Sequence, residues 1–287
     1  MQPSNATNLA CPLDGLPLVA ADRQLRCANG HSFDIARQGY VNLLPVQNKK
    51  SRAPGDSPAM VEARHRFLDA GFYRPISRQV NAMVLQHLPA GAECVVDAGC
   101  GEGYYLDQLS NALISAGYHA HLVGLDIAKP AIIAATRRNK QITWLVASNN
   151  NPALLPQSVD MILCMFGFPI YDAFAKVLKP GGKLLLVDAG PEHLIELRKI
   201  IYPEVRKTEP PALTTAGQAG FQLLDHAALR YSTEDLRQQQ IADLLVMTPH
   251  LYRATKEGKD AAARLEHITL TVDAVFRLLE FRGHISA

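Results

Sequence analysis

Hydrophobic residues change their spacing near residue 93 of this chain, and the change separates two kinds of structure. From there onward, short apolar runs alternate with stretches of helical spacing. This alternation predicts βαβ units and an α/β fold of the Rossmann-like, doubly wound type, with a mainly parallel sheet. The runs expected to form strands, of which the last two should pair, cover residues 93–99, 121–128, 142–148, 158–166, 183–190, 221–231 and 268–281.

Helical spacing fills the intervals between these runs. Before residue 220 we expect helices from the glycine-rich turn through Leu113, from near Pro130, over 171–178 (ending at a KPGG turn) and from near Pro191. A further long helix is predicted between the last two strands. Its cap would be Ser232 or Thr233, and Glu234 and Asp235 would stand in its first turn.

The first 90 residues lack this alternation. Residues 1–46 are rich in Cys, Gly, Pro and Asn, and are too few to bury a core without a staple or a neighbour. Residues 47–90 begin with the turn-rich linker QNKKSRAPGDSP and continue with helical spacing over 60–68 and 75–88. We therefore expect three parts, covering residues 1–46, 47–90 and 91–287.

Composition supports an ordinary globular protein. Apolar residues make up 48% of the 287 residues and charged residues 20%, which excludes wholesale disorder, collagen and coiled coil. The longest apolar run, Met161 to Ile170, spans ten residues, whereas a bilayer span needs roughly 20. No secretory signal is visible at the N-terminus. An odd number of cysteines, five, does not suggest a disulfide framework, so we expect a reducing, cytoplasmic setting without a membrane.

Charge is distributed unevenly, although its sum is only +2. Residues 1–90 hold ten Lys and Arg against six Asp and Glu, a balance of +4, which leaves −2 for the remainder. Seven of these basic residues lie close together: Lys49, Lys50, Arg52, Arg64, Arg66, Arg74 and Arg78. Such a stretch could hold a phosphate backbone or form a solvated helix face, and charge alone leaves both interpretations open.

The segment VVDAGCGEGYY carries the clearest chemical signal. Gly99, Gly101 and Gly103 follow a predicted strand and precede a helix, so that backbone N–H groups face a ligand. The spacing is G-x-G-x-G, not the G-x-G-x-x-G of dinucleotide binders. Asp97 ends the first strand and Asp126 the second, an arrangement that suits a ligand with an ammonium and a sulfonium. The alternative is a tight strand–helix turn in another kind of α/β protein.

A second cluster lies near the N-terminus, where Cys11, Asp14, Cys27 and His31 form two closely spaced pairs. Two such pairs, each on its own turn, have the geometry of a tetrahedral structural zinc site. A carboxylate at the second position is a poorer ligand for zinc than a thiolate. The alternative is therefore a decayed site with two free thiols and a hydrogen-bonded Asp14.

From about Ala92 onward, the fingerprint, GLDIA, SVD and LKPGG resemble the class I S-adenosylmethionine-dependent methyltransferases. The resemblance implies that the three glycines approach the methionine moiety of S-adenosylmethionine and that Asp126 holds the ribose. It also implies that Ser148 and Asn149 flank the adenine.

A narrower resemblance covers nearly the whole chain. The segments HSFDIARQGYVNLLPVQNKKSRAPGDS, ARHRFLDAGFYRPI, GPEHLIELRKIIY and MTPHLYRA are similar to the large-subunit ribosomal RNA guanine-N1 methyltransferases of the RlmA type. That family implies an N-terminal zinc ribbon that helps to recognise an rRNA hairpin, and it allows a homodimer. Its cofactor contacts would fall on Tyr73, Tyr105, Leu106 and His193, with core packing as the alternative for Tyr73 and His193.

Two departures from the family pattern stand out. Asp14 replaces a cysteine, which bears on zinc, and CMFGFPIYD replaces an apolar-Tyr-Ala-Pro-Cys run beside the methyl group. No residue identifies itself as the base that takes the N1 proton. The sequence thus predicts an rRNA (guanine-N1)-methyltransferase. The alternatives are a methyltransferase for a small molecule, tRNA or protein, and a cofactor-binding RNA protein without catalysis.

Overall fold

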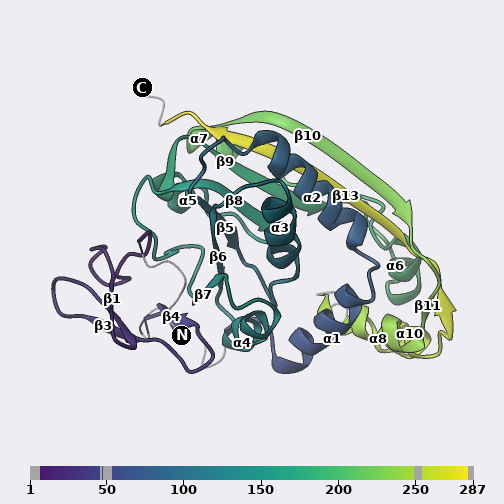
Figure 1. The fold of residues 1–287 in the computed structure, drawn as a ribbon. Coiled ribbons are helices and arrows are strands. Elements are labelled where there is room, and N and C mark those ends of the chain that lie inside the picture. Colours follow the sequence, from purple (N-terminus) through teal and green to yellow (C-terminus); the bar gives the residue numbers. More distant parts are fainter. Residues whose placement is uncertain (1–6, 46, 48–53, 249–253, 284–287) are drawn as a thin grey trace.

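The computed structural model describes residues 7–45, 47, 54–248 and 254–283, and its centre is an eight-stranded sheet (Figure 1). The strand order is β10-β13-β9-β8-β5-β6-β7-β4. The bounds are β4 Val41–Asn42, β5 Cys94–Ala98, β6 His121–Asp126, β7 Thr143–Val146, β8 Val159–Met165, β9 Leu178–Ala189, β10 Phe221–Ser232 and β13 Thr271–Phe281. Strands β4 to β9 run parallel, and β13 lies antiparallel between β9 and β10. The predicted mainly parallel sheet and closing strand pair are confirmed.

Helices cover this sheet because successive strand residues point to opposite faces. Val95 packs into a cluster with Leu106 and Leu109 of α3, whereas the next residue, Val96, packs into a second cluster with Phe174 of α5. The helices are α1 Pro58–Asp69, α2 Arg74–His87, α3 Tyr104–Ser115, α4 Lys129–Arg138, α5 Tyr171–Val177, α6 Ile195–Ile201, α7 Thr214–Gln218, α8 Gln238–Met247 and α10 Lys256–Ala263. The fold is therefore α/β and doubly wound, as predicted.

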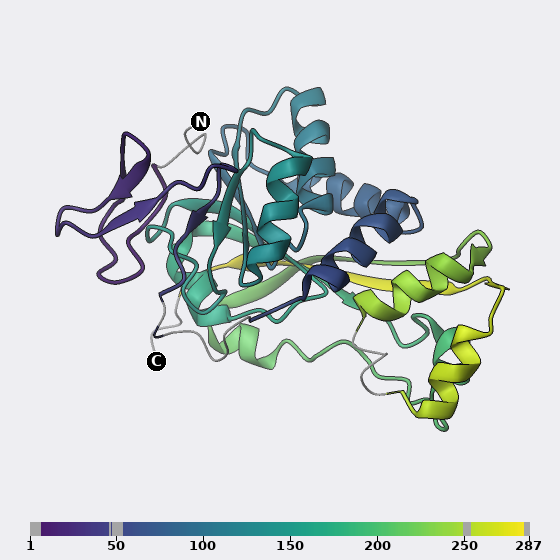
Figure 2. The same cartoon turned by 90° about the horizontal axis from the view of Figure 1, so that it is seen from below.

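The N-terminal segment forms a small antiparallel sheet of β1 (Val19–Ala21), β2 (Gln24–Arg26) and β3 (Ser32–Asp34). Its apolar residues, among them Leu25, join the cluster on the α5 face of the large sheet. The strand β4 follows and pairs with β7 in parallel, a pairing that the sequence pattern did not predict. Figures 1 and 2 show this ribbon and the α8–α10 helices at opposite ends of the molecule.

Two predicted helix starts were wrong. The helix α8 begins at Gln238, because the Thr233 hydroxyl accepts a hydrogen bond from the Leu270 N–H instead of capping a helix. Residues 236–237 then form a short strand, β11, against β12 (His267–Ile268). The helix α6 begins at Ile195, because the chain turns after Pro191 and its N-cap residue, Leu194, has a left-handed φ of +54°.

The KPGG segment also differs from the prediction. It lies within β9, where Val159 pairs with Leu178 but Met161 pairs with Lys183, so the intervening residues form an irregularity in the strand. Across the described ranges, no helix is both long and apolar enough to cross a bilayer.

Candidate cofactor site and metal centre

The loop after β5 places glycine where its backbone is left-handed and, at one position, where a side chain would clash. Gly103 is the N-cap of α3 with φ +84°, and a Cβ atom there would lie 2.6 Å from the Trp144 ring. Gly99 and Gly101 also have positive φ. The loop brings the amino end of α3 to the carboxyl ends of the parallel strands, where α/β folds bind ligands.

The carboxylate of Asp97 lies at the end of β5, buried and unpartnered. Asp97 is only 1% exposed, and neither of its carboxylate oxygens has a hydrogen-bond partner in the described chain. Burial, assisted by the nearby charge of Asp126, raises the pKa of Asp97 to about 7. A buried carboxylate without a partner is costly. A cationic ligand group such as an ammonium would provide the missing partner.

Two other residues of the segment VVDAGCGEGYY carry buried polar atoms of the same kind. The Tyr105 hydroxyl and Oε1 of Glu102 are also buried and have no partner among the described residues, while the other Glu102 oxygen accepts hydrogen bonds from Arg138. In the described ranges only five residues carry such atoms, and three of them lie within residues 97–105. Because protein interiors satisfy nearly all buried polar groups, this clustering indicates a ligand site.

Asp126 ties the glycine loop to the second strand. One carboxylate oxygen accepts from the Gly101 N–H at 2.9 Å and the other from the Ala128 N–H at 2.7 Å. Burial raises the pKa of Asp126, and these two hydrogen bonds oppose the rise. The backbone thus orients the carboxylate, and each oxygen keeps a second lone pair for a ligand hydroxyl.

Ser148 and Asn149 follow β7 and extend the same edge. The Asn149 amide nitrogen would lie 3.9 Å from a Cβ on Gly99, and it donates to the Phe168 carbonyl at 3.3 Å. The Ser148 hydroxyl accepts from the Asn150 N–H. Asn149 therefore links the glycine loop to the segment after β8.

Tyr73, Phe166 and His193 come together from three distant parts of the chain. The Tyr73 hydroxyl and His193 Nε2 lie 3.1 Å apart, and the Phe166 ring centroid lies 6.4 Å from that of Tyr73 and 6.1 Å from that of His193. His193 Nδ1 accepts from the Asp273 N–H, so Nε2 carries the proton in the neutral ring and donates to Tyr73. Burial raises the pKa of Tyr73 well above its usual range. Tyr73 and His193 are indeed buried, and Phe166 is a neighbour that the sequence did not reveal.

The other two predicted cofactor contacts lie in the first turn of α3. Leu106 is fully buried and packs in the core beside Leu109, so its backbone rather than its side chain is available to a ligand. Tyr105 instead offers its side-chain hydroxyl, which has no hydrogen-bond partner in the described part of the chain. The N–H groups at a helix start have no intrahelical acceptor, which suits them to an anionic ligand group.

Arg64 is a site neighbour that sequence reasoning placed elsewhere. Its guanidinium pairs with Asp56 and donates to the Met247 carbonyl, and it lies 3.5 Å from the position of a Cβ on Gly101. Only the PGDS motif and the charge count pointed to this region of the sequence. The linker therefore contributes to the wall beside the glycine loop.

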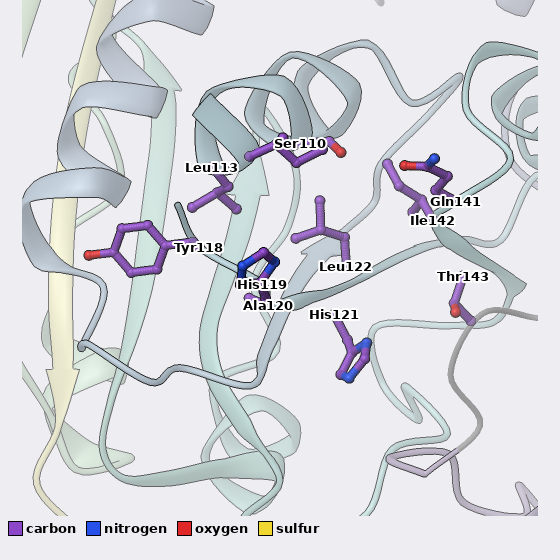
Figure 3. A pocket seen from close by; sticks show the side chains of 11 residues that line it. Ser110, Leu113, Tyr118, His119, Ala120, His121, Leu122, Gln141, Ile142 and Thr143 are labelled. Carbon is purple, nitrogen blue, oxygen red and sulfur yellow. The ribbon is translucent and has the colours of Figure 1, made fainter. Parts of the chain in front are cut away.

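A pocket of about 290 Å³ lies at the other end of the sheet (Figure 3). His121 and Thr143, which line it, begin β6 and β7. The glycine loop follows the carboxyl end of β5, so this pocket is separate from the site described above.

The four predicted zinc ligands converge. One ligand atom from each of Cys11, Asp14, Cys27 and His31 lies within 4.8 Å of the others. His31 Nδ1 lies 3.0 Å from the Asp14 carboxylate, 3.5 Å from Cys11 Sγ and 3.4 Å from Cys27 Sγ. Ligands at ordinary zinc distances are about 3.3 to 3.8 Å apart in a tetrahedron. The set therefore fits zinc, with Asp14 in the place of a thiolate.

Comparison with known proteins agrees with this geometry. A zinc-ribbon family described as "RlmA, N-terminal" matches residues 9–52, and a family described as "Methyltransferase domain" matches residues 95–182. Together, the sheet order, the glycine loop and these matches define the class of the protein. It is an S-adenosylmethionine-dependent methyltransferase of class I, preceded by a zinc ribbon.

Similarity to individual proteins identifies the family within this class. A Streptomyces fradiae protein named 23S rRNA (guanine(748)-N(1))-methyltransferase is 37% identical over 191 residues, 66% of each chain. YxjB of Bacillus subtilis (strain 168) and a protein of Micromonospora griseorubida carry the provisional name 23S rRNA (guanine-N(1)-)-methyltransferase. They are 32% identical, and the alignments cover 92% and 98% of this chain and 93% and 99% of theirs. The chain belongs to the family of 23S rRNA (guanine-N1)-methyltransferases.

Proposed function

We propose that the protein transfers the methyl group of S-adenosylmethionine to N1 of a guanine in a hairpin loop of large-subunit ribosomal RNA. The observation that carries this proposal is similarity to rRNA methyltransferases along nearly the whole chain, ribbon included. A methyltransferase for small molecules would account for the sheet and the glycine loop but leave the ribbon without a role.

In this proposal the fingerprint holds the cofactor. Asp97 pairs with the ammonium, the amino end of α3 around Tyr105 and Leu106 meets the carboxylate, and Asp126 accepts from the ribose hydroxyls. Ser148 flanks the adenine. The assignments follow from the unpartnered atoms and the fixed Asp126 carboxylate. When bound, S-adenosylmethionine supplies an electrophilic methyl group on a sulfonium.

Tyr73, Phe166 and His193 would form the wall beside that methyl group. The buried hydrogen bond between Tyr73 and His193 and the tilted Phe166 ring beside it would limit the access of water from one side of the site. Such a wall would favour transfer because it helps to hold the reactants near attack geometry. Transfer would form the bond from carbon to guanine N1 and break the bond from carbon to sulfur, and the N1 proton would pass to a carboxylate, a histidine or water.

The RNA would be held by residues 1–46 and by the linker and helices of residues 47–90, ahead of a methyltransferase part over 91–287. Not all residues of the predicted basic stretch are available to contact RNA. Arg66 pairs with the buried carboxylate of Asp243, and Arg64 with Asp56, so both are engaged within the protein. Arg74 and Arg78 are exposed on α2 and remain candidates for phosphate contact. Lys49, Lys50 and Arg52 lie outside the described residues.

Zinc would have a structural role in this scheme. Cys11, Asp14, Cys27 and His31 would hold it and fix the two turns of the ribbon. We also propose that the enzyme acts in the cytoplasm, where its rRNA substrate is made. A homodimer, allowed by the family resemblance, stays a prediction that sedimentation of the full chain can test.

The proposal is tested by transfer of a radiolabelled methyl group to rRNA transcripts. Full-length, zinc-loaded protein should label an unmodified large-subunit fragment, and reverse transcription should stop at one guanine, because a methyl on N1 blocks base pairing. A transcript with that guanine changed to adenine is the control and should stay unlabelled. Label found only on tRNA, protein or small molecules would reject the rRNA substrate.

A further inference from the structure

The segment after β8, residues 166–169, is held in place by its backbone while its aromatic side chains stay open. The Phe166 N–H donates to the Val187 carbonyl at 2.7 Å, and the Phe168 carbonyl accepts from Asn149. A Cβ on Gly167 would lie 3.2 Å from Cys164 Sγ and 3.9 Å from the Ala98 carbonyl. The segment is therefore pinned between the ends of β5, β8 and β9.

The two phenylalanines of this segment differ in exposure. Phe166 adopts a left-handed φ of +50°, which is uncommon for a bulky residue, and is 39% exposed. Phe168 is 87% exposed, the most exposed of the large apolar side chains in the described chain. A backbone held on both sides thus carries a largely solvent-exposed aromatic side chain, 87% exposed, on a segment hydrogen-bonded to Asn149 beside the glycine loop.

We propose that Phe168 is the residue on which the target guanine stacks when it enters the site. This inference rests on the proposed function, because it takes a purine base as the ligand. A base methylated at N1 must leave its pairing and stacking, and proteins commonly replace the lost stacking with an aromatic side chain. Phe168 lies two residues after Phe166, whose ring is next to those of Tyr73 and His193.

A stacking role explains the exposure of the Phe168 side chain better than a role in covering the cofactor pocket does. A side chain that only closed the cofactor pocket would pack against the protein, whereas Phe168 contacts solvent over most of its surface. The backbone of Phe168 is hydrogen-bonded to Asn149, whose amide nitrogen also lies near the Gly99 turn, so the residue that carries this exposed ring is tied to the cofactor loop.

Three variants separate the ring's roles: Phe168→Ala, Phe168→Leu and Phe168→Trp. Base–aromatic stacking measured by alanine substitution corresponds to an effect of roughly 5- to 150-fold. We expect Phe168→Ala and Phe168→Leu to lower kcat/KM for the rRNA hairpin within that range, and Phe168→Trp to keep it near the wild-type value. All should bind S-adenosylmethionine as the wild type does. Ile114→Ala is the control, since Ile114 is 60% exposed at the far end of the sheet.

A second measurement reads stacking without methyl transfer. A hairpin carrying 2-aminopurine in place of the target guanine should change fluorescence on binding the wild type and Phe168→Trp, but not Phe168→Ala. Equal kcat/KM in Phe168→Ala and wild type, full activity in Phe168→Leu, or loss of cofactor affinity would each overturn the stacking role. A wild type that binds the hairpin but labels no RNA would instead reject the proposed function.

Discussion

The buried carboxylate of Asp97 makes a quantitative prediction. Its pKa is raised from the ordinary value of 3.8 to about 7, chiefly by burial. The folded protein therefore holds this proton more tightly than the unfolded chain does. The stabilisation that the protonated form provides is complete below about pH 4, and it is lost as pH rises through about 7. About 3 pH units at 1.36 kcal/mol each correspond to up to about 4 kcal/mol.

The isosteric variant Asp97→Asn removes this titration. We expect it to be more stable than the wild type above pH 7 and to lose the advantage as pH falls toward 4. Chemical denaturation of the ligand-free, zinc-loaded protein across this range measures the difference. The variant Asp22→Asn is a matched control, because Asp22 is exposed in a turn with φ +54°, which Asn adopts readily. A stability difference between Asp97→Asn and wild type that stayed constant with pH would refute the reasoning.

The same group should make cofactor binding depend on pH. An ammonium binds the ionised carboxylate, so affinity for S-adenosylmethionine should fall by about tenfold from pH 8 to pH 6. Calorimetry measures it, and 5′-methylthioadenosine, which lacks the ammonium, is the control ligand and should bind equally at both values. Asp97→Asn should bind S-adenosylmethionine weakly at every pH. Parallel pH profiles for the two ligands would contradict a contact between Asp97 and the ammonium.

Three further predictions follow from the site. Asp126→Ala should weaken cofactor binding by roughly 1 to 3 kcal/mol in calorimetry, because two loop N–H groups lose their acceptor; unchanged affinity would contradict this. Gly103→Ala should lower the free energy of unfolding by about 2 to 4 kcal/mol in denaturant titrations, since its Cβ would meet Trp144 at a left-handed φ; equal stability would show that the loop can shift. Asp14→Cys should bind zinc more tightly than the wild type, and Asp14→Ala less tightly, in competition with a chromophoric chelator; equal affinities for all three would remove Asp14 from the ligand set.

Much of the fold was predictable because local pattern decides it. Buried parallel strands produce apolar runs whatever their partners, and the glycine spacing between Asp97 and Asp126 reflects a loop whose backbone is left-handed at Gly99, Gly101 and Gly103. Helix starts were less predictable. Thr233 has the chemistry of a cap, but its hydroxyl binds the Leu270 N–H from the neighbouring strand, so tertiary contact overrides a local preference.

The sequence by itself determined the class of sheet, the cofactor fingerprint and the four candidate zinc ligands, because each depends on residues close together in the chain. Only the tertiary structure decided which distant groups meet. Three contacts join segments far apart in sequence. They are the addition of β4 to the sheet edge, the contact of Tyr73 with Phe166 and His193, and the ion pair between Arg66 and Asp243. These contacts depend on the order of strands in the sheet and on the packing of its two faces. Neither can be deduced from residue spacing along the chain.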